Sequence, residues 1–210
     1  KADSADTLTL CKLGEAYEKA GNYEEALAAY TQVLDREPKN IETLHACSSV
    51  LIHLGRYNEA VRTIDKIIAL QAEDPAALFM RGTVLEKMGR YNEALKSYEK
   101  ALSANPKNAA IWNAFGALMS SLGRQADALG AFEKAIELGD GDVNAWLCKG
   151  IALDHLGKFD QAVACYEKVL ESDPHHLRAW YLKGRALDRQ GRLAEAVECF
   201  KKALENEEKP

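Results

Sequence analysis

The feature that most constrains the fold is a recurrence of the same residue types every 34 positions. Glycine opens the pattern, alanine follows five residues later, and a large apolar residue follows four after that. The glycines are Gly21, Gly55, Gly89, Gly123, Gly157 and Gly191; the alanines are Ala26, Ala60, Ala94, Ala128, Ala162 and Ala196; the large residues are Tyr30, Ile64, Tyr98, Phe132, Tyr166 and Phe200. We therefore expect a polar leader (1–6) and one array of six units, 7–40, 41–74, 75–108, 109–142, 143–176 and 177–210.

Each unit is predicted to form two helices. In the third unit, apolar residues at helical spacing indicate helices over residues 75–88 and 91–104, with Gly89-Arg90 as the break. Helix N-caps are expected at the last position of four units, which is Asn40, Asp74, Asn108 or Asp142. A single helix pair cannot bury its apolar face, so the units are expected to stack into an all-α solenoid.

Composition limits the classes of function. The net charge of −5 gives no basic field for nucleic acid, and no apolar run is long enough to cross a membrane. No signal peptide is recognisable, and Lys1 in place of methionine suggests a processed product or an excised fragment. The five cysteines include no CxxC pair, so reduced thiols and a cytoplasmic location are expected rather than disulfides or a zinc site.

The repeat resembles the tetratricopeptide repeat (TPR) family, whose signature is W-x2-L-G-x2-Y, then A-x3-F, then P. The fifth unit carries Trp146, Gly150, Ala162, Tyr166 and Pro174 at the matching positions. Tryptophan also stands at the first signature position in the fourth and sixth units. The resemblance implies a right-handed superhelical α-solenoid of six TPR units.

The resemblance also implies a site. In this family the first helix of each unit lines a concave groove that binds peptides or proteins. The residues at the groove positions that we take as the partner-binding set are His45, Phe79, Thr83, Asn113, Leu147, Ile151, Tyr181, Arg178, Arg185 and Arg189.

Four members of this set are large apolar residues that the repeat signature does not require: Phe79, Leu147, Ile151 and Tyr181. Exposed together in a groove, they would form an apolar binding surface. The alternative is that some of them pack against the neighbouring first helix.

Charge is uneven along the groove positions. The first two units contribute Glu15, Glu18 and Glu42 against Lys19, and the sixth contributes Arg178, Arg185 and Arg189 against Asp188. A partner is therefore expected to place acidic groups near the sixth unit, unless these charges only solvate an exposed repeat. The Lys and Asn clamp of chaperone-binding TPR domains is not matched, because no unit has Lys at position 5 or Asn at position 9.

Catalysis is not expected. The chain lacks the phosphate-binding, dinucleotide-binding, zinc-protease and nucleophile-elbow motifs, so we predict no enzyme, no cofactor and no metal. His175 and His176 are expected in a solvated loop between units.

The leading interpretation is a protein-interaction scaffold that binds a partner segment in the concave groove. One alternative is the TPR arm of a larger multidomain protein. Another is a structural element that self-associates through the uncapped last unit, whose final helix carries Val197 and Leu204.

Overall fold

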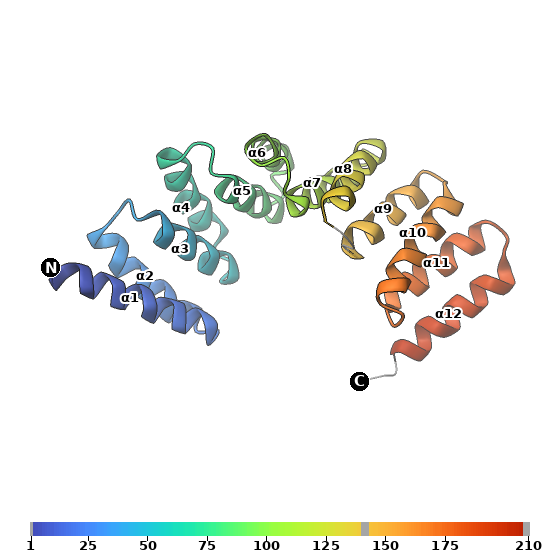
Figure 1. The fold of residues 1–210 in the computed structure, drawn as a ribbon, viewed down its shortest axis with the longest axis horizontal. Coiled ribbons are helices and arrows are strands. Elements are labelled where there is room, and N and C mark those ends of the chain that lie inside the picture. The colour runs from blue at the N-terminus through green and yellow to red at the C-terminus, as the bar shows by residue number, and fades with distance from the viewer. Residues whose placement is uncertain (1, 140–142, 208–210) are drawn as a thin grey trace. The chain divides into compact units, whose positions relative to one another are not determined.

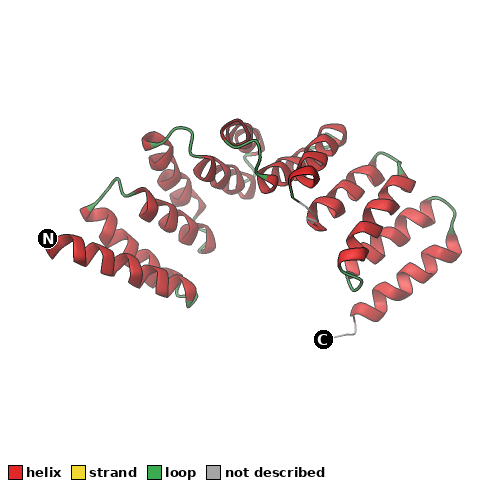
Figure 2. Cartoon of the chain, in the orientation of Figure 1, coloured by secondary structure: helices red, strands yellow, loops and turns green. Residues whose placement is uncertain are grey.

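The computed structural model describes residues 2–139 and 143–207, and within these ranges every regular element is an α-helix (Figure 2). The helices are α1 (Ala2–Lys19), α2 (Tyr23–Arg36), α3 (Ile41–His53), α4 (Tyr57–Leu70), α5 (Pro75–Lys87), α6 (Tyr91–Ala104), α7 (Ala109–Ser121), α8 (Gln125–Leu138), α9 (Val143–His155), α10 (Phe159–Ser172), α11 (Leu177–Arg189) and α12 (Leu193–Glu207). The predicted all-α fold of helix pairs is confirmed; in the third unit α5 ends one residue before the predicted range, and α6 has the predicted bounds.

The contacts divide the chain into two compact units, one ending at Pro106 and the other beginning at Lys107. We call them the N-terminal half (α1–α6) and the C-terminal half (α7–α12), and each contains three of the helix pairs (Figure 1). Within each half, every helix packs on the helices that precede and follow it in sequence. In the C-terminal half, α9 also contacts the other first helices, α7 and α11. A single continuous array remains a prediction.

The turn inside each helix pair depends on the periodic glycine. All six of these glycines have φ between 71° and 79°, the left-handed region that other residues adopt only with strain. In the third repeat, the amide of Arg90 then donates to the carbonyl of Leu85 at 2.8 Å, which closes the end of α5. The recurrence of glycine thus marks the end of each first helix.

Three of the four predicted N-caps are confirmed. The side chains of Asn40, Asp74 and Asn108 each accept a hydrogen bond from backbone N–H groups two or three residues further on. These bonds satisfy donors that the first turn of a helix leaves unpaired. Asp142 lies outside the described residues.

Residues 2–6, which were expected as a polar leader, form the first turns of α1. Residues 2–13 contain neither proline nor glycine, so no helix-breaking residue prevents α1 from beginning at Ala2. α1 is therefore longer than every other first helix.

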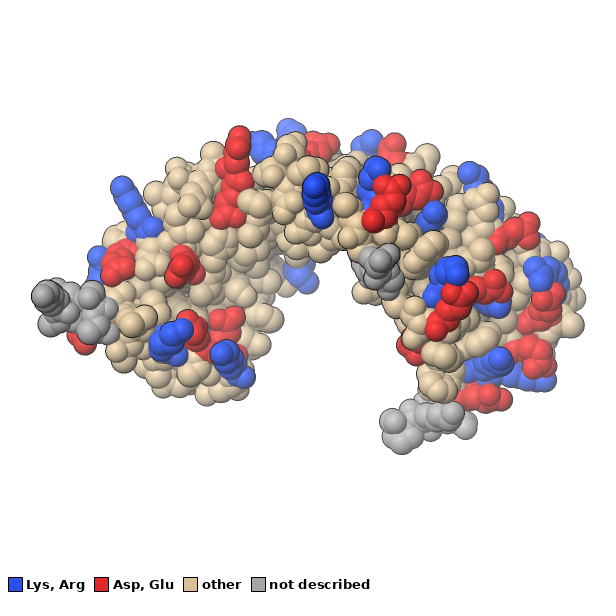
Figure 3. Space-filling model, in the orientation of Figure 1, with Lys and Arg blue, Asp and Glu red and all other residues tan. Residues whose placement is uncertain are grey.

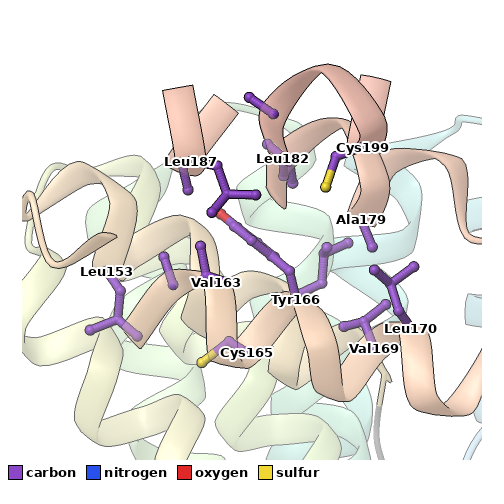
Figure 4. Close-up of a cluster of buried hydrophobic side chains, with 14 residues drawn as sticks. Leu153, Val163, Cys165, Tyr166, Val169, Leu170, Ala179, Leu182, Leu187 and Cys199 are labelled. Carbon is purple, nitrogen blue, oxygen red and sulfur yellow. The ribbon is translucent and has the colours of Figure 1, made fainter. Parts of the chain in front are cut away.

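In five of the six helix pairs a glycine of the first helix meets an aromatic ring of the second, whereas the second pair has Ser48 and Ile64 at these positions. A Cβ added at Gly150 would lie 2.5 Å from a ring carbon of Tyr166, and the equivalent glycines in the other repeats meet their aromatic rings in the same way. Tyr166 is fully buried in the cluster of α9–α12 shown in Figure 4, with its hydroxyl end directed toward Leu187. Close packing at this point fixes the first helix of each pair against the second.

Candidate functional site

The groove positions of the N-terminal half lie on α3 and α5, and their side chains already have partners within that half. His45 Nε2 lies 2.8 Å from the carboxylate of Asp74, which caps α5. Phe79 is partly buried with its ring centroid 5.9 Å from that of Tyr98. The hydroxyl of Thr83 donates to the carbonyl of Phe79 at 3.1 Å. This half therefore offers a mixed surface in which His45 links one first helix to the start of the next.

Two of the acidic side chains at the start of the chain are also engaged. Lys12 donates to both carboxylate oxygens of Glu15, and the pair is exposed. Glu18 accepts a hydrogen bond from the hydroxyl of Tyr30 at 3.1 Å. A hollow of about 320 Å³ opens beside them, lined in part by Glu15 and Glu42. Figure 3 shows acidic and basic side chains interspersed on the visible face of each half.

The apolar groove positions of the C-terminal half differ in exposure. Leu147 on α9 is only 5% exposed and belongs to the core cluster, so at this position the packing alternative is the one observed. Ile151, one turn further along α9, is partly buried against the same cluster. Tyr181 on α11 is 48% exposed, although its ring still contacts that of Phe200 at 6.0 Å between centroids. Asn113 on α7 is partly buried, and its side-chain oxygen has no partner among the described residues.

Two of the three arginines at the groove positions of the sixth repeat form ion pairs within the chain. Asp154 on α9 is buried, and its carboxylate accepts from Arg185 Nη2 at 3.3 Å and from Arg189 Nη1 at 3.0 Å. The two arginine side chains are 35% and 45% exposed. Arg178, at the start of α11, is exposed. The arginines therefore join two adjacent first helices and still face solvent.

Arg185 also lies near an aromatic ring. Its guanidinium carbon is 6.0 Å from the ring centroid of Tyr181, and that of Arg189 is 5.7 Å from the ring centroid of Phe159. A guanidinium at this distance is attracted to the negative face of an aromatic ring. Tyr181, Arg185, Arg189 and Asp154 thus form one contiguous group, which we call the α9–α11 site.

Two features of this region were missed from sequence. Asp154 holds the same groove position as Glu18 and Glu86, but its contact with the two arginines of the next repeat was not predicted, because the register does not show which partner the carboxylate takes. His176 was expected in a solvated loop, but its Nδ1 accepts the Ala179 amide at 3.1 Å and caps α11. Histidine is not among the usual N-cap residues, so sequence rules did not point to it.

The described parts of the chain, 2–139 and 143–207, contain no group of three or more His, Cys, Asp or Glu side chains that could hold a metal ion. In the same ranges, no helix has the length and apolar character needed to cross a membrane.

Comparison with known families now accounts for the helix pairs. Tetratricopeptide repeat models match residues 17–79, 75–108, 97–130 and 147–210. The chain belongs to the tetratricopeptide repeat family. This TPR chain has no match among curated protein sequences. Proteins built from such repeats typically serve as interaction scaffolds through their extended surfaces rather than as enzymes.

Solved structures agree with this assignment. A crystal structure of MamA is 27% identical, with 77% of this chain and 94% of that chain covered and a TM-score of 0.73. The structure of YrrB, described as a TPR protein with an unusual peptide-binding site, is 25% identical, with 85% and 92% covered and a TM-score of 0.72. A tetratricopeptide repeat protein from Parabacteroides merdae is 18% identical, with 98% and 81% covered and a TM-score of 0.83, which supports the fold alone.

Proposed function

We propose that this TPR chain is an interaction scaffold whose first helices bind a segment of a partner protein. The proposed contact residues are the exposed or partly exposed members of the predicted set, and Leu147 contributes by packing beneath them. The peptide-binding site named for YrrB supports this proposal, since that protein shares the fold and 25% of its residues with this chain. The cytoplasmic location inferred from the cysteines is part of the proposal.

The exposure of Tyr181 carries the proposal. A tyrosine that is 48% exposed presents a large, rigid contact surface at a groove position where the repeat signature requires no aromatic residue. Aromatic side chains beside arginine are typical of the few interface residues that supply most of the binding energy. The adjacent Arg185 adds hydrogen-bond donors to this surface.

The test is selection of binders from a random peptide display library on the purified full chain. The affinity of a selected peptide is then compared for Tyr181→Ser and for Leu204→Ser, a matched control in which an exposed apolar residue changes on the second helix α12. We expect Tyr181→Ser to weaken binding about thirtyfold, the loss of a typical anchor residue, and Leu204→Ser to leave it unchanged. Equal effects of the two substitutions, or failure to select any peptide, would contradict the proposal.

A second candidate function is self-association through α12. Val197 and Leu204 are 50% and 63% exposed, whereas Val163 and Leu170, at the same positions one repeat earlier, are 7% and 8% exposed beneath α11. The face of α12 therefore matches a surface that a first helix covers elsewhere in the chain. Sedimentation velocity over a wide range of protein concentration tests this candidate: association that Val197→Asp abolishes supports it, and a monomer at every concentration excludes it.

A further inference from the structure

Asp154 is unusual because it is a nearly buried carboxylate at the centre of a proposed binding surface. It is 5% exposed, and it contacts both Arg185 and Arg189 across the boundary between two repeats. Moving a charge into such a position is costly unless opposite charges and hydrogen bonds compensate for the lost water. The two arginines supply that compensation, so part of their binding capacity is already used by the chain itself.

The other odd-numbered repeats show that this use of the carboxylate is specific to the fifth. In the first and third repeats the equivalent acid is Glu18 or Glu86, and it accepts from the tyrosine hydroxyl of its own repeat at 3.1 or 2.9 Å. In the fifth repeat the acid is shorter by one methylene group. The hydroxyl of Tyr166 has no partner in the described part of the chain, and the carboxylate of Asp154 turns to the arginines of the next repeat.

The arginines retain capacity for a second carboxylate. Each guanidinium carries five N–H donors, and each contacts Asp154 through one nitrogen. The carboxylate of Asp154 faces two guanidinium groups, so its single negative charge does not neutralise both. The site therefore keeps a net positive charge on solvent-accessible guanidinium groups, next to the exposed ring of Tyr181.

We propose that the α9–α11 site binds a partner segment in which an Asp or Glu residue stands beside an apolar residue. We further propose that Asp154 is an internal occupant of this site: its carboxylate already uses some of the arginine donors and so lowers the affinity for the partner segment. This inference rests on the proposed scaffold function and adds the chemistry of the ligand. The segment's carboxylate takes the open donors of Arg185 and Arg189, and its apolar side chain packs on Tyr181. Bidentate contacts between guanidinium and carboxylate groups favour this chemistry over that of a neutral segment.

The presence of Asp154 has a predictable effect on affinity. Its charge lies within contact distance of the same arginines, so it repels an incoming carboxylate and shares their donors. Removing this charge while keeping the shape of the side chain, in Asp154→Asn, is expected to tighten binding of an acidic peptide about tenfold, the effect of one nearby like charge at a partly exposed site. A purely structural role for Asp154 predicts the opposite change, because its loss would leave the arginines without an anchor.

The experiment uses the peptide display library on four forms of the full chain: wild type, Arg185→Gln/Arg189→Gln, Asp154→Asn, and Lys168→Gln/Lys201→Gln. The last is a control of matched charge on second helices, where both lysines are exposed and pair with a glutamate three residues away. Circular dichroism checks that all four are folded. We expect Asp and Glu next to apolar residues to be enriched on the wild type and the control, and this enrichment to disappear on the double arginine variant.

The outcomes separate this inference from the function on which it rests. Peptides selected without acidic enrichment, or bound equally by the double arginine variant, overturn the inference and leave the scaffold function standing. Failure to select any peptide counts against both. Weaker or unchanged binding to Asp154→Asn overturns the role of Asp154 as an internal occupant. Self-association of the wild type that the double arginine variant abolishes identifies a second copy as the occupant and also overturns the proposal.

Discussion

Replacing Tyr166 by phenylalanine is expected to stabilise the C-terminal half. The hydroxyl of Tyr166 is fully buried and has no hydrogen-bond partner within residues 2–139 and 143–207. Phenylalanine occupies the same repeat position at Phe132 and Phe200, so its ring fits the site without the hydroxyl. The matched comparison is Tyr98→Phe, because the hydroxyl of Tyr98 donates to the carboxylate of Glu86 at 2.9 Å.

The magnitudes follow from the two environments. A buried hydroxyl without a partner costs about 1–3 kcal/mol, so Tyr166→Phe is expected to raise the free energy of unfolding by about 1 kcal/mol or more. A hydrogen bond to a charged group contributes about 1.5–3 kcal/mol, and water can partly replace it at Glu86, which is partly exposed. Tyr98→Phe is therefore expected to lower the free energy of unfolding by about 1–2 kcal/mol.

The tryptophans make the assay selective. Trp112, Trp146 and Trp180 all lie in the C-terminal half, so tryptophan fluorescence reports unfolding of that half, whereas circular dichroism reports both. For a unit of roughly 100 residues, a change of 1 kcal/mol shifts the melting temperature by about 4–8 °C. Tyr166→Phe should raise the fluorescence midpoint, and Tyr98→Phe should lower the circular dichroism midpoint and leave the fluorescence midpoint nearly unchanged.

The reasoning fails if Tyr166→Phe destabilises the C-terminal half as much as Tyr98→Phe destabilises the other half. That result would mean that the Tyr166 hydroxyl has a strong hydrogen-bond partner in solution. An unchanged midpoint would also count against the expected penalty for the unpartnered hydroxyl.

Three further predictions concern helix caps, glycines and thiols. Burial raises the pKa of Asp74, but hydrogen bonds from backbone N–H groups and from His45 outweigh burial and hold the pKa below its usual value. The stability that Asp74 adds over Asp74→Asn should therefore be present above about pH 4 and vanish as the pH falls through the lowered pKa. Urea unfolding at a series of pH values measures this difference. Gly150→Ala should destabilise the chain by about 1–3 kcal/mol, because the added methyl group meets a buried ring. Gly130→Ala on α8, where the added methyl group meets nothing, should stabilise the chain by about 0.5–1 kcal/mol. Thermal melts in which both variants shift the melting temperature in the same direction would contradict the packing argument. Burial raises the pKa of the Cys47 thiol to about 11, so this thiol should react with a maleimide far more slowly than the thiol of partly exposed Cys148. Mass spectrometry of the labelled peptides measures both rates, and equal rates would contradict this prediction.

The local structure of this chain follows closely from its sequence. The periodic glycines place the turns, since a left-handed residue is needed at the end of each first helix. Asn40, Asp74 and Asn108 mark helix starts because their short polar side chains satisfy the first free amides. These signals act over a few residues, and the period repeats each of them along the chain, which is why the helix pairs could be predicted.

The site could be predicted only in outline. Groove positions follow from the repeat register, but the burial of Leu147 depends on how closely α9 packs against its neighbours. The contact between Asp154 and the arginines depends on the direction that its carboxylate takes, toward α11 rather than toward Tyr166, and the residue type alone does not determine that direction. The cap formed by His176 likewise depends on the orientation of its ring.

Hydrogen exchange of the chain with and without a library-selected peptide, read by mass spectrometry, tests most directly whether the first helices form the binding surface. We predict slower exchange on binding in the first helices that carry the proposed contact residues, α3, α5, α7, α9 and α11, with the largest change around Tyr181, and little change in α4, α6, α8, α10 and α12. Amides in the second helices serve as the internal control within the same sample. Protection confined to the second helices, or spread equally over both sets, would contradict the account.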